Sequence, residues 1–291
     1  MNHKKIKVAV FGDSILDLFS YHISPRQSPE ASVPIIIKEK EEYFAGGAAL
    51  LATKLSELGT SVDLFTQIGK DLNSKILKSK LKNLNVFDYS KSSYKTTIKE
   101  RIIVENKYYL RKDNEEIQSP FRKSIIDTFK KKASRYDAVI FSDYAKGFLD
   151  KNLFNNIKVI CQTNNLLTFI DPSIKNKFDF KDINYFKPNF EEAVRLSERK
   201  TLKEILNYLS SAYNTIPVIT LGESGSASIE NNKVIYSSKY KTKTVDTSGS
   251  GDIFFAYFVY SILNNKSLLQ SLNYSSKEAS KHVKFFGFSK N

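Results

Sequence analysis

A seven-residue loop near the end of the chain has the residue types that phosphoryl transfer requires. It reads D-T-S-G-S-G-D over residues 246–252, and an apolar helical run follows at once. Glycine-rich backbone at a helix N-terminus offers free N–H groups and the positive end of the helix dipole to a phosphate. We predict that the N–H groups of Gly249, Ser250 and Gly251 stabilise a transferring phosphoryl group, and that Asp252 accepts a proton from the attacking hydroxyl. The simpler alternative is a tight turn capped by Asp246.

The elements that must hold this loop alternate between strand and helix along the chain. Short apolar and β-branched runs predict strands at residues 6–11, 62–67, 138–142, 167–171 and 216–221. Apolar positions at helical spacing predict helices at residues 48–58, 72–81, 202–209 and 253–263. Ser119-Pro120 has the residue types that cap and begin another helix. This alternation favours an α/β fold with a mostly parallel central sheet covered on both faces.

Two segments interrupt this alternation. Residues 32–43 contain Val33-Pro34-Ile35-Ile36-Ile37, which is strand-like despite its proline, and residues 95–110 alternate β-branched with charged side chains. Both patterns are typical of exposed antiparallel strands. We therefore expect a small β-sheet that is inserted into the α/β domain and acts as a lid. Because the faces of such a lid are partly apolar, we also expect a homodimer that forms through it.

Length and composition limit the class of protein. The chain has 291 residues, enough to bury a large core without disulfides, and its single cysteine, Cys161, has no partner for an intramolecular bridge. The apolar run at residues 6–11 is too short for a signal-peptide core, and no run approaches the roughly 20 residues of a membrane span. We expect a cytoplasmic protein with no membrane partner.

The net charge of +14 raises the alternative of a nucleic-acid-binding protein. Of the 45 basic residues, however, 38 are lysine and only seven are arginine, whereas recognition of bases and phosphates favours the planar fork of arginine. The lysines are also dispersed over the whole chain instead of forming one stripe. We therefore interpret the charge as a solvated basic surface and expect no nucleic-acid partner.

The motifs together resemble those of the ribokinase-like (PfkB) sugar kinases. The loop at 246–252 is similar to that family's D-T-x-G-A-G-D, with Ser250 in place of alanine. The resemblance implies a ribokinase-like three-layer sandwich, in which residues 1–291 form a single kinase domain with lid segments at approximately 14–45 and 88–112. It also implies ATP and Mg²⁺ as cofactors, and it leaves the need for a monovalent cation open.

The resemblance also implies a set of sugar-binding residues. Asp13 follows the first strand, where family members hold sugar hydroxyls, and Gly46 and Gly47 open a helix in the family's N-terminal signature. Taken alone, Asp13 is better explained as a turn or helix cap. Leu50 departs from the family, which usually has asparagine there, and this change removes a hydrogen-bonding side chain at a substrate position.

Three further passages resemble the heptose-7-phosphate kinases, the kinase half of a bifunctional heptose kinase/adenylyltransferase. They are R-Q-S-P-E-A-S-V-P at residues 26–34, S-D-Y-A-K-G at residues 142–147, and the segments T-I-K-E-R and L-R-K-D at residues 97–101 and 110–113. The resemblance implies that the substrate is a sugar phosphate contacted by Lys99, Arg101, Arg111 and Lys146. For Lys99 and Arg101 the alternative is charge on the solvated face of a lid strand.

The nucleotide side of the site is implied by two more motifs. K-P-N-F-E-E at residues 187–192 resembles the family's P-N-x-x-E, in which Asn189 and Glu192 would position Mg²⁺ through water. The alternative is a capping box that uses the same two side chains. T-L-G-E-S-G at residues 220–225 resembles a segment that lies along ATP, or is otherwise a hairpin turn. The residues implied at the nucleotide are Asn189, Glu192, Thr220, Gly222, Gly225 and Thr247.

The implied reaction is ATP-dependent phosphorylation of D-glycero-β-D-manno-heptose 7-phosphate to the 1,7-bisphosphate, a step toward cell-surface polysaccharide. The sequence has no counterpart of the adenylyltransferase half, and we expect a separate protein to supply it. Two alternatives stay open beside this reading. One is a kinase for a different sugar or sugar phosphate, and the other is a non-catalytic relative that binds a ligand. A chain that only binds has no need of Asp252 and of the loop at residues 246–252, which we call the anion loop.

Overall fold

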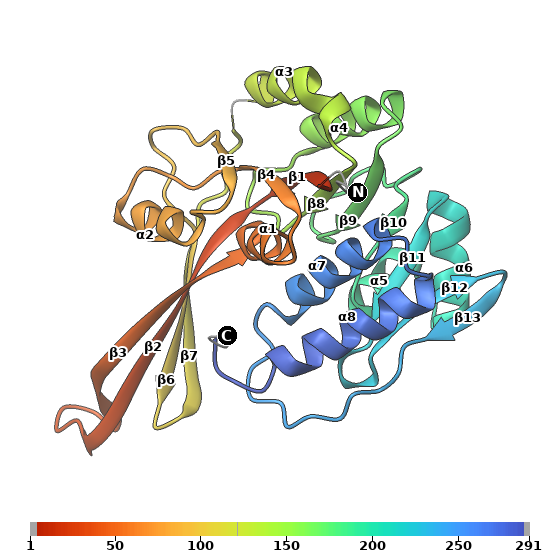
Figure 1. Ribbon diagram of the computed structural model, residues 1–291. Helices are drawn as coiled ribbons and strands as arrows, with labels where there is room; N and C mark the ends of the chain where they lie inside the picture. Colours follow the sequence, from red (N-terminus) through yellow and green to blue (C-terminus); the bar gives the residue numbers. More distant parts are fainter. Residues whose placement is uncertain (1–4, 121, 288–291) are drawn as a thin grey trace.

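The computed structural model describes residues 5–120 and 122–287, which form a nine-stranded and a four-stranded sheet (Figure 1). The nine-stranded sheet has the order β13-β12-β11-β10-β9-β8-β1-β4-β5. Strands β11 to β5 in this order are parallel, whereas β12 and β13 run antiparallel to their neighbours. The strand bounds are β1 Lys7–Gly12, β4 Ser61–Thr66, β5 Asn85–Asp88, β8 Ala138–Ser142, β9 Leu167–Asp171, β10 Tyr185–Phe186, β11 Ile216–Thr220, β12 Ser226–Glu230 and β13 Lys233–Tyr236.

Eight α-helices in the described part of the chain cover both faces of this sheet. One face packs against α1 (Ala48–Glu57), α2 (Leu72–Lys80), α7 (Ser250–Leu263) and α8 (Leu268–His282). The other packs against α3 (Arg122–Lys132), α4 (Lys151–Thr163), α5 (Phe190–Ser197) and α6 (Leu202–Tyr213). The predicted three-layer sandwich with a mostly parallel sheet is confirmed.

The two-residue period of the strands divides the core between these faces. In β1, Val8 and Val10 belong to the core under α1 and α7, whereas Ala9 and Phe11 belong to the core under α3 and α4. All four side chains are fully buried, which is why β1 is a continuous apolar run with no polar alternation. The Phe11 ring packs edge-on against Phe129 of α3 with centroids 5.0 Å apart, so that contact docks the helix on the sheet.

The four-stranded sheet projects from one end of the sandwich (Figure 1). Its order is β3-β2-β6-β7, with β2 Ser14–Gln27, β3 Pro34–Gly47, β6 Ile98–Val104 and β7 Lys107–Asn114. The predicted small inserted sheet is therefore confirmed, and we call these four strands the lid. The expectation that all of its strands are antiparallel is wrong in one respect. The hairpins β2–β3 and β6–β7 are antiparallel, but β2 and β6 pair in parallel because they come from two separate insertions.

One predicted helix start also differs. Helix α3 is described from Arg122, whereas Ser119-Pro120 was expected to begin it, and residue 121 lies outside the described residues. The Ser119 hydroxyl accepts a hydrogen bond from the Arg122 guanidinium at 3.0 Å. Among residues 5–120 and 122–287, no helix has the length and apolar content to cross a membrane.

Candidate active site

The carboxyl ends of the parallel strands bring the predicted Asp13 and two further charged residues to one edge of the sheet. Asp13 follows β1, Asp171 ends β9, and Lys187 follows β10. The loop at 246–252 leads into α7, which packs against the same sheet. Ligands of open α/β sheets bind at this edge, beyond the carboxyl ends of the strands. The edge also adjoins the lid, because β1 is followed directly by β2.

The anion loop is held in shape by Asp246 and by one glycine. Ser248 donates to Asp246 Oδ1 through its N–H at 3.0 Å and its hydroxyl at 2.8 Å. Gly249 is the N-cap of α7 with φ of 73°, a conformation that favours glycine. His282 Nε2 donates to the Ser248 carbonyl at 2.8 Å and ties the loop to the end of α8. The turn capped by Asp246 is thus present, and it presents the helix N-terminus.

The N–H groups of the loop are not equivalent. The Ser250 N–H donates to the Thr247 carbonyl at 3.1 Å, so in this conformation it is directed into the loop. Within the described part of the chain, the N–H groups of Gly249 and Gly251 donate to no backbone carbonyl outside regular helix bonds. Gly249 and Gly251 are therefore better placed to bind an anion than Ser250, whose part in catalysis stays a prediction.

Asp252 lies at the start of α7 and is buried, with 3% of its surface exposed. The Tyr144 hydroxyl lies 2.7 Å from each of its carboxylate oxygens. Burial raises the pKa of Asp252 to about 7, and the charge of Asp171 adds to this rise, whereas the hydrogen bond from Tyr144 and the charge of Lys187 oppose it. A base whose pKa lies near neutrality suits proton abstraction at physiological pH.

Lys187 and Asp171 form a buried ion pair beside the loop. The Lys187 ammonium lies 2.9 Å from Asp171 Oδ2, and a Cβ added to Gly251 would lie 3.9 Å from the same nitrogen. Burial raises the pKa of Asp171 to about 6, and Lys187 opposes that rise. The sequence prediction did not include either residue in the site. The available signal was the place of Asp171 at the end of a predicted strand and of Lys187 directly before P-N.

Asp13 is engaged by the loop that follows β8. Its carboxylate accepts hydrogen bonds from the N–H groups of Tyr144, Lys146 and Phe148 at 3.0, 3.2 and 3.0 Å. Burial raises the pKa of Asp13, and these three hydrogen bonds counteract the rise. The contacts are those of the turn-cap alternative. Asp13 therefore positions residues 144–148, and its contact with sugar hydroxyls stays a prediction.

A second aspartate, Asp17 of β2, lies where the lid meets the sandwich, and sequence reasoning missed it. Its carboxylate pairs with Arg101 of β6, and it lies so close to Gly46 that any side chain there would overlap it. Gly47 has φ of 58°, and a Cβ there would overlap the Asp13 carbonyl and lie 3.3 Å from the Tyr144 ring. Both glycines are thus required by close approach, as the resemblance implied for small residues at this place.

The predicted cations of the lid lie on one face, and most have an acidic partner. Arg111 is directly opposite Arg101 in the β6–β7 register, and its Nε contacts Asp113 at 2.9 Å. Lys146 is not part of the lid: it lies in the loop after β8 and forms an ion pair with Glu115.

Lys99 forms no salt bridge with any described residue, and its ammonium lies over the Tyr144 ring, 5.1 Å from the centroid. Burial lowers the pKa of Lys99. An anion beside it would counteract that burial cost.

The nucleotide-side residues begin α5 and end β11. Asn189 and Glu192 form the capping box, with each side chain bonded to the other's N–H at 2.9 and 2.8 Å. Asn189 also forms a parallel bridge with Thr220. The motif's glycines occur in the turn beyond Thr220, where Gly222 begins a short 3-10 helix and has open space around its Cβ position. The Gly225 N–H donates to the Gly222 carbonyl at 3.0 Å and closes this turn, and Thr247 is exposed.

The carboxylates near this capping box are compatible with Mg²⁺. No cluster of three or more potential ligands occurs among residues 5–120 and 122–287. Mg²⁺ at a phosphate site, however, keeps several waters and takes only one or two carboxylates from the protein. The charge of Glu192 raises the pKa of Asp171, so these two acids lie on the same side of the site. The donor set thus fits a water-mediated ion.

Comparison with known sequences agrees with this geometry. A model of the "pfkB family carbohydrate kinase" matches residues 5–289. The chain is 32% identical over 285 residues to "Bifunctional protein HldE" of Helicobacter pylori (strain J99), and this match covers 94% of the chain and 62% of the relative. The protein of the same name from Sulfurimonas denitrificans is 30% identical, and 60% of its length is covered. The chain thus spans about three-fifths of the curated relatives it matches.

Solved structures show the same fold at low sequence identity. Phosphofructokinase-2 from Escherichia coli superposes with a TM-score of 0.78 at 17% identity, covering 97% of this chain and 94% of the other. Ribokinase from Thermotoga maritima superposes with a TM-score of 0.73 at 19% identity, covering 98% and 95%. With the family model matched over nearly the whole sequence and the anion loop and buried aspartate in place, the chain belongs to the pfkB family of carbohydrate kinases.

Proposed function

We propose that this carbohydrate kinase transfers the γ-phosphoryl group of ATP to a sugar that already carries a phosphate, and that its acceptor is D-glycero-β-D-manno-heptose 7-phosphate. The observation that carries the proposal is the buried Asp252 at the anion loop, linked through Tyr144 to the cationic face of the lid. The likeness to proteins named bifunctional HldE supports a heptose phosphate as the acceptor.

In this mechanism Asp252 accepts the proton of the attacking hydroxyl. The sugar oxygen forms a bond to the γ-phosphorus while the bond from that phosphorus to the β–γ bridging oxygen breaks, and the electron pair leaves with ADP. The N–H groups of Gly249 and Gly251 and the ammonium of Lys187 stabilise charge on the transferring group. The product is the 1,7-bisphosphate when the anomeric hydroxyl attacks.

The lid cations would hold the phosphate that the acceptor brings. Arg101 of β6 and Arg111 of β7 lie directly opposite each other on neighbouring strands. Two like charges in these positions repel each other unless anions lie between or beside them. Each has an aspartate partner, which leaves Lys99 as the cation with most to gain from a phosphate. Asp13, Gly46, Gly47 and Lys146 would complete the sugar side of the site.

ATP would lie along the opposite side, at Thr220, Gly222, Gly225 and Thr247. Asn189 and Glu192 would hold Mg²⁺ through water, and the ion, when bound, would neutralise charge on the ATP phosphates. The capping box is compatible with this role because each side-chain oxygen retains a free lone pair. A requirement for a monovalent cation is left to experiment.

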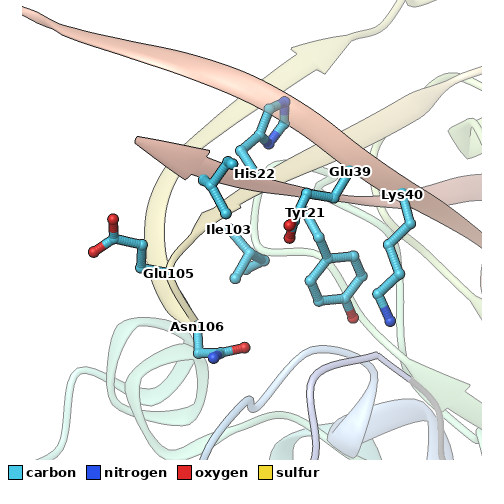
Figure 2. Close-up of a pocket in the computed structure, with 8 residues that line it drawn as sticks. Tyr21, His22, Glu39, Lys40, Ile103, Glu105 and Asn106 are labelled. Carbon is cyan, nitrogen blue, oxygen red and sulfur yellow. The ribbon is translucent and has the colours of Figure 1, made fainter. Parts of the chain in front are cut away.

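We also propose that residues 1–291 act as a single kinase domain that forms a homodimer through the lid. Apolar side chains are exposed on three lid strands, including Ile23, Ile37 and Leu110. A pocket of about 350 Å³ lies between β2, β3 and β6, with Tyr21 and Lys40 in its wall (Figure 2). The buried, unpaired thiol of Cys161 supports a reducing compartment such as the cytoplasm.

The test is ATP consumption with Mg²⁺ on a panel of sugars and sugar phosphates, with the Asp252→Asn variant as the control. Turnover confined to heptose 7-phosphate, and lost in the variant, supports the full proposal. Turnover on another sugar retains the kinase and rejects the heptose. Absence of turnover on every acceptor while ATP still binds would reject catalysis and favour the ligand-binding alternative.

A further inference from the structure

The carboxylate of Asp252 is surrounded by groups from four elements. Tyr144 reaches it from the loop after β8, Asp171 from the end of β9, Lys187 from the residue after β10, and Asp17 from β2. Among the described residues, only the Tyr144 hydroxyl is hydrogen-bonded to the side chain of Asp252. The other three act on it through charge alone. Tyr144 is therefore the group that can fix the direction in which the carboxylate points.

Tyr144 is itself held from several sides. Its N–H donates to Asp13 Oδ2 at 3.0 Å, and its ring edge lies against the Cα of Gly47 closely enough that a Cβ there would approach to 3.3 Å. The Lys99 ammonium of the lid lies over the ring face. Burial and the charge of Asp252 raise the pKa of Tyr144 well above 10, so the phenol stays protonated and is the donor in its contact with Asp252. A rigid donor of this kind orients its acceptor.

We propose that Tyr144 is the positioning residue for the base of the reaction: it donates a hydrogen bond to one Asp252 oxygen and leaves the other oxygen to receive the proton of the sugar hydroxyl. The inference rests on the proposed function, since it assigns Asp252 as the base. The Tyr144 proton is not transferred at any step. The acceptor hydroxyl takes the place of one of the two contacts that the phenol makes in the sugar-free enzyme.

The donated hydrogen bond has a second effect. It stabilises the ionised form of a carboxylate that burial otherwise keeps protonated. Loss of the hydroxyl would therefore change two things together. The carboxylate would lose its orientation, which lowers kcat. It would also ionise at higher pH, which moves the acid limb of the pH–rate profile to higher pH. KM for ATP would change little, because the hydrogen bonds and the cation–π contact of Tyr144 with described residues involve Asp13, Asp252 and Lys99 and no nucleotide-side residue.

The chain offers a matched control in a second buried tyrosine–aspartate pair. The Tyr136 hydroxyl donates to Asp63 Oδ2 at 2.6 Å, and Tyr136 precedes β8 at the opposite edge of the sheet. Tyr136→Phe removes an equivalent hydrogen bond without touching Asp252. Comparison of Tyr144→Phe with Tyr136→Phe separates a loss of stability from a loss of positioning.

The experiment measures kcat and KM from pH 5 to 9 for the wild-type protein and both variants. We expect Tyr144→Phe to lower kcat by roughly 10- to 100-fold, the range for one charge-assisted hydrogen bond, and to shift its acid limb to higher pH. Tyr136→Phe is expected to leave the limb in place. The proposal would be overturned if the acid limb of Tyr144→Phe lies at the same pH as that of the wild-type protein. Equal changes of kcat and of the acid limb in both variants would overturn it as well.

A readout without turnover keeps this test separate from that of the kinase activity. The carboxyl titration of Asp252 is followed by carbon NMR in the wild-type protein and in Tyr144→Phe, and assigned by its loss in Asp252→Asn. A higher pKa in Tyr144→Phe supports the contact even if the wild-type protein phosphorylates no sugar, in which case only the proposed function fails. An unchanged titration overturns the role of Tyr144.

Discussion

The guanidinium of Arg101 lies 2.5 Å from the carboxylate of Asp17, and the two join the central strands of the lid where it meets the sandwich. Only 8% of each side chain is exposed. Burial and the partner's charge act in opposite directions on Arg101, and its pKa is raised by Asp17. This pair adjoins Gly46, so it connects the segment before α1 with the lid.

We expect Arg101→Ala to destabilise the protein by about 3–5 kcal/mol, because it leaves a buried aspartate without its partner. The double variant Arg101→Ala/Asp17→Asn also removes the unpaired charge of Asp17, and we expect it to regain much of the lost free energy of unfolding. Urea unfolding of the three proteins measures the difference. Equal stability of the single and double variants would show that water or another cation already compensates Asp17.

The phosphate role of the lid is tested more cleanly at Lys99, which lacks an acidic partner among the described residues. Lys99→Met is expected to raise KM for a sugar phosphate about 10- to 100-fold and to leave KM for the unphosphorylated sugar unchanged, since one charge-assisted contact is lost. Lys112→Met is the control, because Lys112 is on the adjacent β7 strand and exposed. Equal effects on both acceptors would remove Lys99 from phosphate binding.

The elevated pKa of Asp252 has a direct kinetic consequence. Burial places this pKa at about 7 in the free enzyme, above its ordinary value of 3.8. Because the base must be ionised, kcat/KM is expected to rise about tenfold per pH unit below 7 and to level off above it. Lys187→Met removes a charge that lowers this pKa, so its acid limb is expected at higher pH. A limb near pH 4 in the wild-type protein would contradict the buried base.

Local motifs predicted the sandwich, the inserted sheet and the anion loop, because each depends on residues that are close in sequence. The alternation of strand-like with helix-like segments is enough to indicate a parallel sheet. The D-T-S-G-S-G-D loop contains the residues that form its turn and begin the next helix. The contacts that complete the site are different. Tyr144 and Asp252 are 108 residues apart, and Asp17 and Arg101 are 84 apart. The pattern of residues within one segment therefore cannot predict these contacts.

Position in the sequence explains why Asp13 was easier to notice than Asp17, since both side chains are buried. Asp13 directly follows the glycine that ends the first strand, where a carboxylate is expected to face a ligand, yet its oxygens are bonded to three N–H groups. Asp17 is surrounded by apolar neighbours in the sequence and resembles an interruption of a strand. Only the approach of β6, which brings Arg101 beside it, shows why a charge is tolerated there.

The two interpretations of Glu192 make opposite predictions for one variant. Glu192→Gln keeps a side-chain oxygen that accepts the Asn189 N–H, so the capping box and the stability of α5 are expected to change by less than about 0.5 kcal/mol. The charge is lost, however, so the Mg²⁺ concentration for half-maximal activity is expected to rise. Glu204→Gln is the matched control, since Thr201 and Glu204 form an equivalent box at α6.

Activity is titrated with Mg²⁺ at fixed ATP in the wild-type protein and both variants, and thermal unfolding is measured alongside. A shift in the Mg²⁺ requirement that is confined to Glu192→Gln would show that this carboxylate acts on the metal as well as on the helix. The same variant is expected to lower the pKa of Asp171, because the charge of Glu192 raises it in the native protein. If both variants behave alike in the Mg²⁺ titration, the box at α5 is a helix cap and nothing more.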